Sequence, residues 1–201
     1  MEYRAPTTSE LNEMKALVND AMMDGAFGLS TGLYYSPSGF ADTKEVIELC
    51  RVVSPYGGIY HSHIRGESAM VVESVQEAIT IGEEANVPVE IAHHKAYGQA
   101  YWPLIDQTLT LMEQARDRGV DVTCNVYPYL FGQTGLSAMI PYWAHAGGRH
   151  ALIQRLRDPE IRKRLKQDMQ HGLSGWESHV KATGWETIIV ARCPVHEEYE
   201  A

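Results

Sequence analysis

The feature that most constrains the fold is a recurring pair of patterns, in which a short apolar run is followed by an amphipathic stretch. The apolar runs are typical of buried β-strands, and the amphipathic stretches have apolar residues at helical spacing. Successive apolar runs begin about 30 residues apart, which is enough for a strand, a crossover helix and two loops. We therefore predict a parallel sheet built from consecutive βα units. The strands are expected at residues 26–31, 58–64, 88–93 and 120–127.

Two folds account for most parallel sheets of this kind, the open doubly wound sheet and the closed (β/α)8 barrel. An open sheet usually carries a glycine-rich nucleotide-binding turn after a strand. Neither G-x-G-x-x-G nor G-x-x-x-x-G-K-[ST] occurs in this sequence, so the barrel is favoured. A complete barrel takes about 250 residues. The chain has 201, with a further strand suggested at 187–190, so we predict an α/β fold that is a partial (β/α)8 TIM barrel of four to five units.

A long segment before residues 187–190 does not follow the repeat. It contains Gly147-Gly148 and a charged helix predicted over 149–171, which is interrupted near Asp158-Pro159. We predict residues 138–185 to be a helical insertion within a single incomplete barrel domain spanning 1–201. The charges indicate a solvated face, although an insertion at this end of a barrel could also act as a lid.

Charge and cysteine content exclude several classes of function. The net charge of −9 argues against a surface for nucleic acid or anionic membrane, so a small-molecule partner is expected. Three widely spaced cysteines without a C-x-x-C motif predict neither a disulfide framework nor a zinc knuckle. No apolar run approaches the roughly 18 residues of a membrane span, and the first residues lack the apolar core of a signal peptide. We therefore expect a cytoplasmic location.

Histidines gather at the ends of the predicted strands, where the active site of a barrel lies. The second strand ends with His61 and His63, and the third with His93, His94 and Lys95. Because side chains alternate across a strand, His61 and His63 share one face, whereas His94 points away from His93 and Lys95. Imidazoles from two adjacent strands can converge on one Zn²⁺. The ligand pair is then His63 with His93 or, alternatively, His61 with His63.

His63 is nearer than His61 to the end of its strand, and Arg65 follows it at two residues, where a guanidinium would lie near an anionic substrate. Four segments near the strand ends extend the pattern: 25–35, 60–65, 89–95, and 126–129 followed by 134–137. Together and in this order they resemble the N-acyl-D-amino-acid deacylases, or D-aminoacylases, of the amidohydrolase superfamily. The resemblance covers nearly the whole chain.

The resemblance implies a zinc-dependent hydrolase that removes the acyl group from an N-acyl-D-amino acid by attack of a zinc-bound hydroxide. It implies His63 and His93 as ligands of one or two Zn²⁺ ions. It also implies that Lys95 lies near the substrate carboxylate, that Tyr127 acts catalytically at the scissile carbonyl, and that Tyr35 contacts the substrate.

Gln133 stands where the family often has a small hydroxyl residue that can help bind the substrate carboxylate. We include Gln133 and Arg65 among the predicted substrate-binding residues, and expect Gln133 to affect substrate preference and not the type of reaction. The family's first-strand H-x-H pair, bridging cysteine or carboxylate, and last-strand aspartate find no match here. We therefore expect an internal fragment that is inactive in isolation and could self-associate through exposed barrel edges.

Two other functions remain open. A cyclic-amide hydrolase of the dihydroorotase or dihydropyrimidinase type would use the same metal chemistry on a ring amide. A half-barrel could also serve as a non-catalytic binding module.

Overall fold

The strands form a single parallel sheet. The computed structural model describes residues 2–199, so residues 1, 200 and 201 of the predicted domain lie outside the described residues. The strand order is β1-β2-β3-β4, and one row of the register joins Ser30, His61, Glu90 and Thr123. The predicted α/β fold with a parallel sheet is confirmed. The strands are β1 (Gly28–Gly32), β2 (Ile59–His63), β3 (Val89–Ile91) and β4 (Val122–Cys124).

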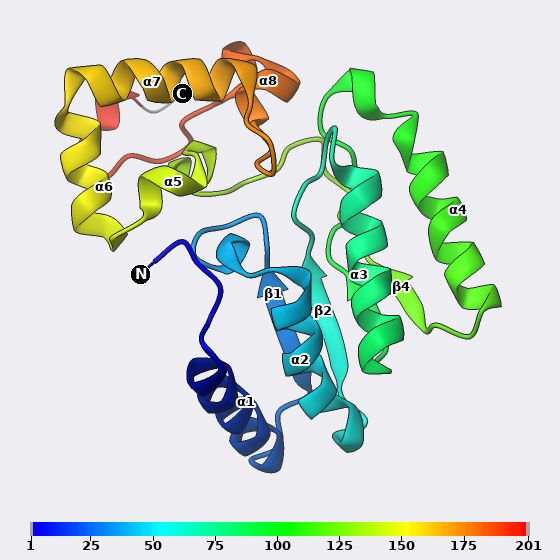
Figure 1. Cartoon of the computed structure of the whole chain (residues 1–201). Helices are drawn as coiled ribbons and strands as arrows, with labels where there is room; N and C mark the ends of the chain where they lie inside the picture. The colour runs from blue at the N-terminus through cyan, green and yellow to red at the C-terminus, as the bar shows by residue number, and fades with distance from the viewer. Residues whose placement is uncertain (1, 200–201) are drawn as a thin grey trace.

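Three helices connect consecutive strands and pack on one face of the sheet, and a further helix precedes β1 (Figure 1). These helices are α1 (Thr8–Met23), α2 (Thr43–Val53), α3 (Val71–Ala85) and α4 (Leu104–Asp117), with short 3-10 turns η1 (Ser38–Phe40), η2 (Ser54–Tyr56) and η3 (Gln99–Tyr101). The start of α1 is fixed by a capping box, in which Thr7 Oγ1 accepts from the Glu10 N–H and the Glu10 carboxylate accepts from the Thr7 N–H.

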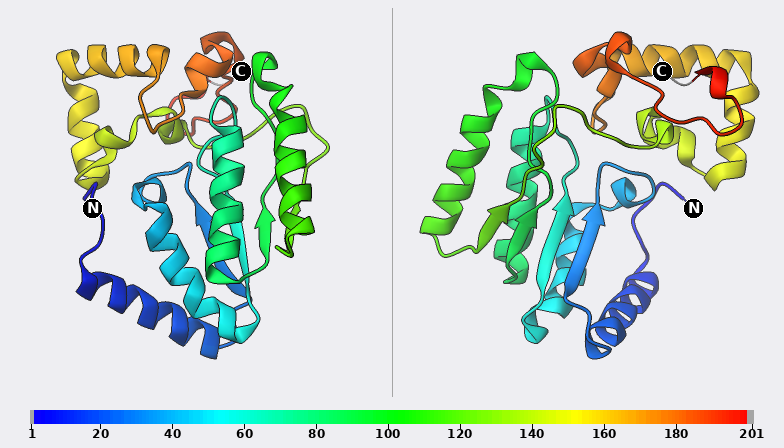
Figure 2. Two further views of the ribbon diagram at one scale, coloured as in Figure 1. Left: turned by 45° about the vertical axis from the view of Figure 1, so that its right-hand side comes forward. Right: turned by 180° about the vertical axis from the view of Figure 1, so that it is seen from behind.

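A large apolar cluster fills the space between the sheet and these helices. Tyr60, Val89 and Ile91 enter it from the strands, and Val75 and Ile79 enter it from α3. The other face of the sheet has no helix in front of it when the molecule is seen from behind (Figure 2, right). The strand side chains therefore divide into a buried set and a set that faces away from the helices.

The chain after β4 forms a helical segment, which we define as residues 136–187. It lies beyond the carboxyl ends of the strands (Figure 1) and has a small core of its own, formed by Tyr142, Met169, Trp176 and Val180. None of the helices within residues 2–199 is long and apolar enough to cross a membrane. The segment consists of η4 (Leu136–Met139), α5 (Tyr142–His145), α6 (Gly148–Arg157), α7 (Pro159–His171), α8 (His179–Thr183) and η5 (Trp185–Thr187); η6 (Glu197–Tyr199) follows it.

The predicted break in the charged helix is confirmed, and the suggested fifth strand is wrong. Asp158 ends α6 and caps α7, accepting from the N–H groups of Glu160 and Ile161. Residues 188–190 have no regular structure after η5. The apolar residues there do not join a sheet, because Ile188 packs against the small core of the helical segment. The strands β3 and β4 are also shorter than predicted.

Candidate active site

The structure brings His63 and His93 together. His63 is the last residue of β2, and His93 follows β3 by two residues. Their ring centroids lie 4.4 Å apart in an edge-to-face arrangement. His63 Nε2 is buried without a hydrogen-bond partner, so it is available as a metal ligand. The strand-end prediction thus places this pair correctly, and the role of the two imidazoles as ligands stays a prediction.

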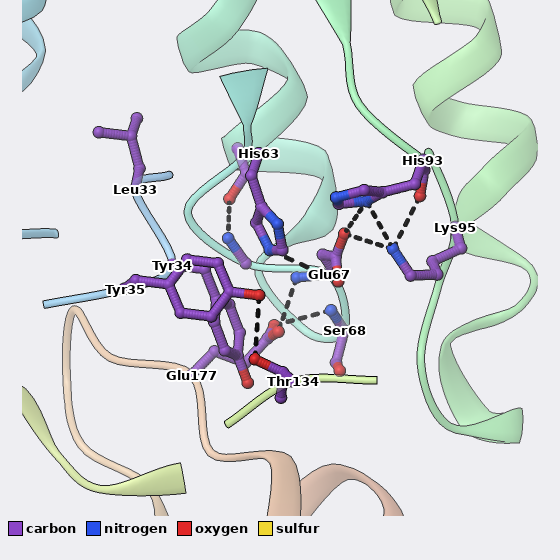
Figure 3. Close-up of polar contacts among 12 residues, drawn as sticks. Leu33, Tyr34, Tyr35, His63, Glu67, Ser68, His93, Lys95, Thr134 and Glu177 are labelled. Atoms are coloured by element: carbon purple, nitrogen blue, oxygen red, sulfur yellow. Dashed lines mark hydrogen bonds and ion pairs between the residues drawn. The ribbon is translucent and has the colours of Figure 1, made fainter. Parts of the chain in front are cut away.

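Glu67, which the sequence analysis missed, completes the cluster. Its side chain is 3% exposed, and its Oε1 lies 3.1 Å from His93 Nδ1. The other oxygen, Oε2, lies 3.9 Å from His63 Nε2 (Figure 3). Each of the three residues offers a ligand atom within 4.8 Å of the others. Two imidazoles and a carboxylate form a donor set that suits Zn²⁺.

Lys95 neutralises the buried carboxylate. Its Nζ donates to Glu67 Oε1 at 2.6 Å and to the His93 carbonyl oxygen at 2.7 Å, and lies 2.8 Å from His93 Nδ1. Burial opposes ionisation of Glu67, but the hydrogen bond with His93 and the charge of Lys95 outweigh it and lower the pKa of this carboxyl. Burial lowers the pKa of His63 to about 4, so His63 is neutral, as a metal ligand must be, at neutral pH.

The turn that carries His93 has an unusual backbone. His93 has a φ of 39°, in the left-handed region that non-glycine residues rarely adopt. Asn125, just after β4, holds this turn by accepting from the His93 N–H at 2.6 Å, while its own amide donates to Glu90. The next residue, His94, is buried against α4, with Nε2 2.8 Å from Thr108 Oγ1. The prediction that His94 points away from the site is confirmed.

Aromatic and polar side chains surround the cluster. The Tyr35 ring stands edge-on to His63 at 4.7 Å, and the Tyr35 hydroxyl accepts from Thr134 Oγ1 at 3.2 Å. The Tyr127 ring lies 6.3 Å from His93 and 5.3 Å from Lys95 Nζ. A cavity of about 80 Å³ joins these groups. Six of the seven predicted site residues line it, namely Tyr35, His63, His93, Lys95, Tyr127 and Gln133, together with Glu67.

The structure corrects the prediction for Arg65. Its guanidinium forms two hydrogen bonds to Glu77, at 2.9 and 3.0 Å, and donates to the carbonyl oxygens of Gly39 and Ala41. It is not among the residues that line the cavity. The alternation that would put Arg65 on the face of His63 ends with β2 at His63, and the chain then turns.

The missed residue Glu67 had a weak signal in the sequence. It lies between β2 and α3, and loops that follow barrel strands supply active-site residues. A search of those loops for carboxylates would have included it. Glu177, whose carboxylate contacts the backbone of the same loop, is 110 residues from Glu67, and no local pattern indicates that contact.

Comparison with known proteins gives consistent matches. No family model matches the chain. The D-aminoacylase of Alcaligenes xylosoxydans xylosoxydans is 44% identical over 133 residues, which are 66% of this chain and 27% of that enzyme. A crystal structure of D-aminoacylase superposes with a TM-score of 0.60 and 41% identity, over 63% of this chain and 26% of that one.

An N-acyl-D-glutamate deacylase from Bordetella bronchiseptica, solved with zinc and a phosphonate mimic of the tetrahedral intermediate, gives a TM-score of 0.62 and 34% identity. That match covers 64% of this chain and 27% of the deacylase. The chain thus spans about a quarter of the length of the relatives it matches.

Proposed function

We propose that this chain, which is homologous to the D-aminoacylases and N-acyl-D-amino-acid deacylases over about 63% of its length, forms part of a metal-dependent hydrolase that removes the acyl group from N-acyl-D-amino acids. The observation that carries the proposal is the convergence of His63, Glu67 and His93 at the carboxyl ends of two adjacent strands, beside a cavity lined by Lys95 and Tyr127.

In this proposal the sheet belongs to a partial (β/α)8 barrel, with residues 138–185 as a helical insertion. Two observations support this: the face of the sheet opposite the helices is uncovered (Figure 2), and the candidate site lies at the carboxyl ends of the strands, as in such barrels. The outer strands among the described residues are β1 and β4. Phe27, beside β1, is 91% exposed, so self-association through these edges is part of the proposal.

The residues present fit a zinc ion. His63 and His93 would hold it, because His63 has a free buried nitrogen and both imidazoles face one point, and Glu67 is within reach as a further ligand. Zinc would supply the Lewis acidity that activates water and polarises an amide carbonyl. The zinc-containing relative from Bordetella bronchiseptica supports this choice of metal.

The chain's own residues would bind and orient the substrate. Lys95 is the cation of the cavity, and its ammonium already donates to the Glu67 carboxylate and to the His93 carbonyl oxygen. A substrate carboxylate would therefore share this ammonium with those acceptors. Tyr127 would help bind the carbonyl oxygen as charge develops on it. Tyr35 and Gln133 would line the remainder of the cavity and contact the substrate.

Zinc binding tests the ligand assignment. In a Zn²⁺ titration, the His63→Ala and His93→Ala variants should each bind the metal more weakly than the unmodified chain. His61→Ala is the matched control, since His61 shares the strand and face of His63 but lies outside the cluster, and should bind zinc as the unmodified chain does. Unchanged zinc binding in both His63→Ala and His93→Ala would overturn the assignment. Loss of zinc binding in His61→Ala would favour the alternative in which His61 and His63 of one strand are the ligand pair.

Activity tests the idea that the site is partial. The 201-residue chain should bind zinc weakly and give no measurable hydrolysis of N-acetyl-D-amino acids. Clear turnover by this chain would contradict the proposal of a partial site. Turnover of hydantoin or dihydroorotate in place of N-acetyl-D-amino acids would contradict the proposed substrate class.

A further inference from the structure

The carboxylate of Glu177 is bound by backbone N–H groups of the loop that carries Glu67. One oxygen accepts from the Glu67 N–H at 2.6 Å, and the other accepts from the Ser68 N–H at 2.8 Å (Figure 3). The second oxygen also accepts from the Met70 N–H at 3.1 Å. Glu177 is 8% exposed. A residue of the helical segment thus satisfies three N–H groups beside the candidate site, across 107–110 positions of sequence.

These N–H groups need an acceptor. Met70 is the N-cap position of α3 and provides no side-chain cap, and Glu177 accepts from the Met70 N–H and from two N–H groups that precede it in the loop. A carboxylate suits this end of a helix because the first N–H groups carry partial positive charge. Gly66 permits the close approach, since a Cβ there would lie 2.7 Å from Met70 Cβ and 3.0 Å from a Glu177 oxygen. Without Glu177, buried donors would lose their partner.

The main chain of Glu67 is held on both sides. Its N–H is bound by Glu177, and its carbonyl oxygen accepts from the Tyr97 N–H at 2.7 Å. With the backbone held in this way, the Glu67 carboxylate points toward His93 and Lys95. The position of this carboxylate therefore depends on a residue of the helical segment.

A second contact ties the helical segment to the loop after β1. The Tyr142 hydroxyl donates to the carbonyl oxygen of Leu33 at 2.7 Å and lies 3.2 Å from that of Tyr34. Tyr35, whose ring stands against His63, is the next residue. The helical segment is thus attached to two loops that carry residues of the cavity.

We propose that Glu177 is a positioning residue, which fixes the loop of residues 66–70 so that Glu67 supports His93 and the metal. The helical segment is then a fixed support of the site at this point, and not only a cover above it. The part of this inference that concerns the metal rests on the proposed function.

Amide hydrogen exchange and cobalt binding test the inference on the full 201-residue chain. In Glu177→Ala, the amides of Glu67, Ser68 and Met70 should exchange faster, and Co²⁺ should bind about 10- to 100-fold more weakly, as expected for loss of a group that orients a ligand. Formate, which can occupy the place of the missing carboxylate, should restore both slow exchange and cobalt affinity. The exchange rates and cobalt affinity of Glu177→Gln should lie between those of the unmodified chain and Glu177→Ala, because the glutamine amide keeps only one acceptor oxygen.

The exposed Glu160 of α7 provides the matched control. Glu160→Ala should change neither measurement, with or without formate. Unchanged exchange at the three amides in Glu177→Ala, or faster exchange with unchanged cobalt affinity, would overturn the positioning role. A general loss of structure in Glu177→Ala that formate does not reverse, with Glu177→Gln equal to the unmodified chain, would also overturn it. If the unmodified chain binds no Co²⁺, the proposed function fails, and the exchange rates still decide whether Glu177 fixes the loop.

Discussion

The strand-bearing part of the molecule and the helical segment are held in place by different forces. In the first, one apolar cluster runs from the strands into α2, α3 and α4. In the second, the buried core has four members, with Phe40 of η1 packed against it, and Glu177 and Tyr142 add polar contacts with the site loops. Burial of apolar surface stabilises the first part directly. The second part also depends on a few buried hydrogen bonds. If one acceptor is removed, the buried donor left without a partner lowers the stability of the folded state.

The largest effect is expected where the two parts meet, at Glu67. Glu67→Ala leaves the half-buried ammonium of Lys95 without its carboxylate partner, and breaking such a pair costs at most about 3–5 kcal/mol of stability, the range for fully buried pairs. Urea denaturation of the metal-free chain would measure this loss. Exposed ion pairs contribute less than about 1 kcal/mol. A loss of stability within that range would show that the pair of Glu67 and Lys95 contributes no more than an exposed ion pair.

A double variant separates the charge from the packing. Glu67→Gln combined with Lys95→Met removes both charges while keeping similar side-chain volume, so much of the stability lost in Glu67→Ala should return. Zinc affinity should not return, because the carboxylate is absent. Recovery of stability without recovery of metal binding would assign the two effects of Glu67 to separate causes. Equal stability of the double variant and Glu67→Ala would contradict the ionic explanation.

The next largest effects are expected from alanine substitutions in the two apolar cores. Ile91→Ala, in the large core, should lower the free energy of unfolding by about 2–5 kcal/mol and speed amide exchange throughout the sheet. Trp176→Ala, in the small core, should speed exchange in α7 and α8 while β2 and β3 keep their protection. Equal acceleration in β2 after both substitutions would show that the two parts unfold as one unit.

The same division explains how much could be predicted from the sequence. The βα repeat is local, so it located the four strands. The alternation expected over 88–93 also separated His93 from His94, although both residues lie just beyond the end of β3. Alternation failed at Arg65, because the strand ends two residues earlier and Glu77 captures the guanidinium. The suggested strand at 187–190 failed because no β-pairing forms there and Ile188 packs against the core of the helical segment.

The contact between Glu67 and Glu177 lay beyond prediction for a different reason. It joins positions 110 residues apart and uses backbone N–H groups, which every residue but proline carries. A sequence pattern cannot indicate which of many glutamates will cap a distant loop. The helical segment was located by its interrupted charged helix, whereas its attachment to the site appears only in three dimensions.

A smaller effect concerns pH and the docking of α8. The His179 ring stands edge-on to Tyr97, and burial lowers the pKa of His179, while the charge of Glu67 opposes the shift. The unfolded chain therefore takes up this proton at a higher pH than the folded chain does. Stability should fall as the pH decreases below about 6.5, by at most about 1.4 kcal/mol per pH unit.

Urea denaturation at pH 7.5 and 5.5 measures this dependence. His63 contributes a change of the same sign, because burial also lowers its pKa. The relevant quantity is therefore the difference between the unmodified chain and His179→Gln, whose glutamine does not titrate. A pH dependence that is equal in the two proteins would exclude His179 as a contributor.

The smallest effect compares two aspartate caps of matched chemistry. Asp42 accepts from the Glu45 N–H at the start of α2, and Asp158 accepts from Glu160 and Ile161 at the start of α7. Replacing either by alanine should cost about 1 kcal/mol. Because α2 packs into the large core, Asp42→Ala should lower the free energy of global unfolding. Asp158→Ala should speed amide exchange within α6 and α7 and leave that of β2 and β3 unchanged, unless the helical segment is coupled to the sheet more tightly than its polar contacts indicate.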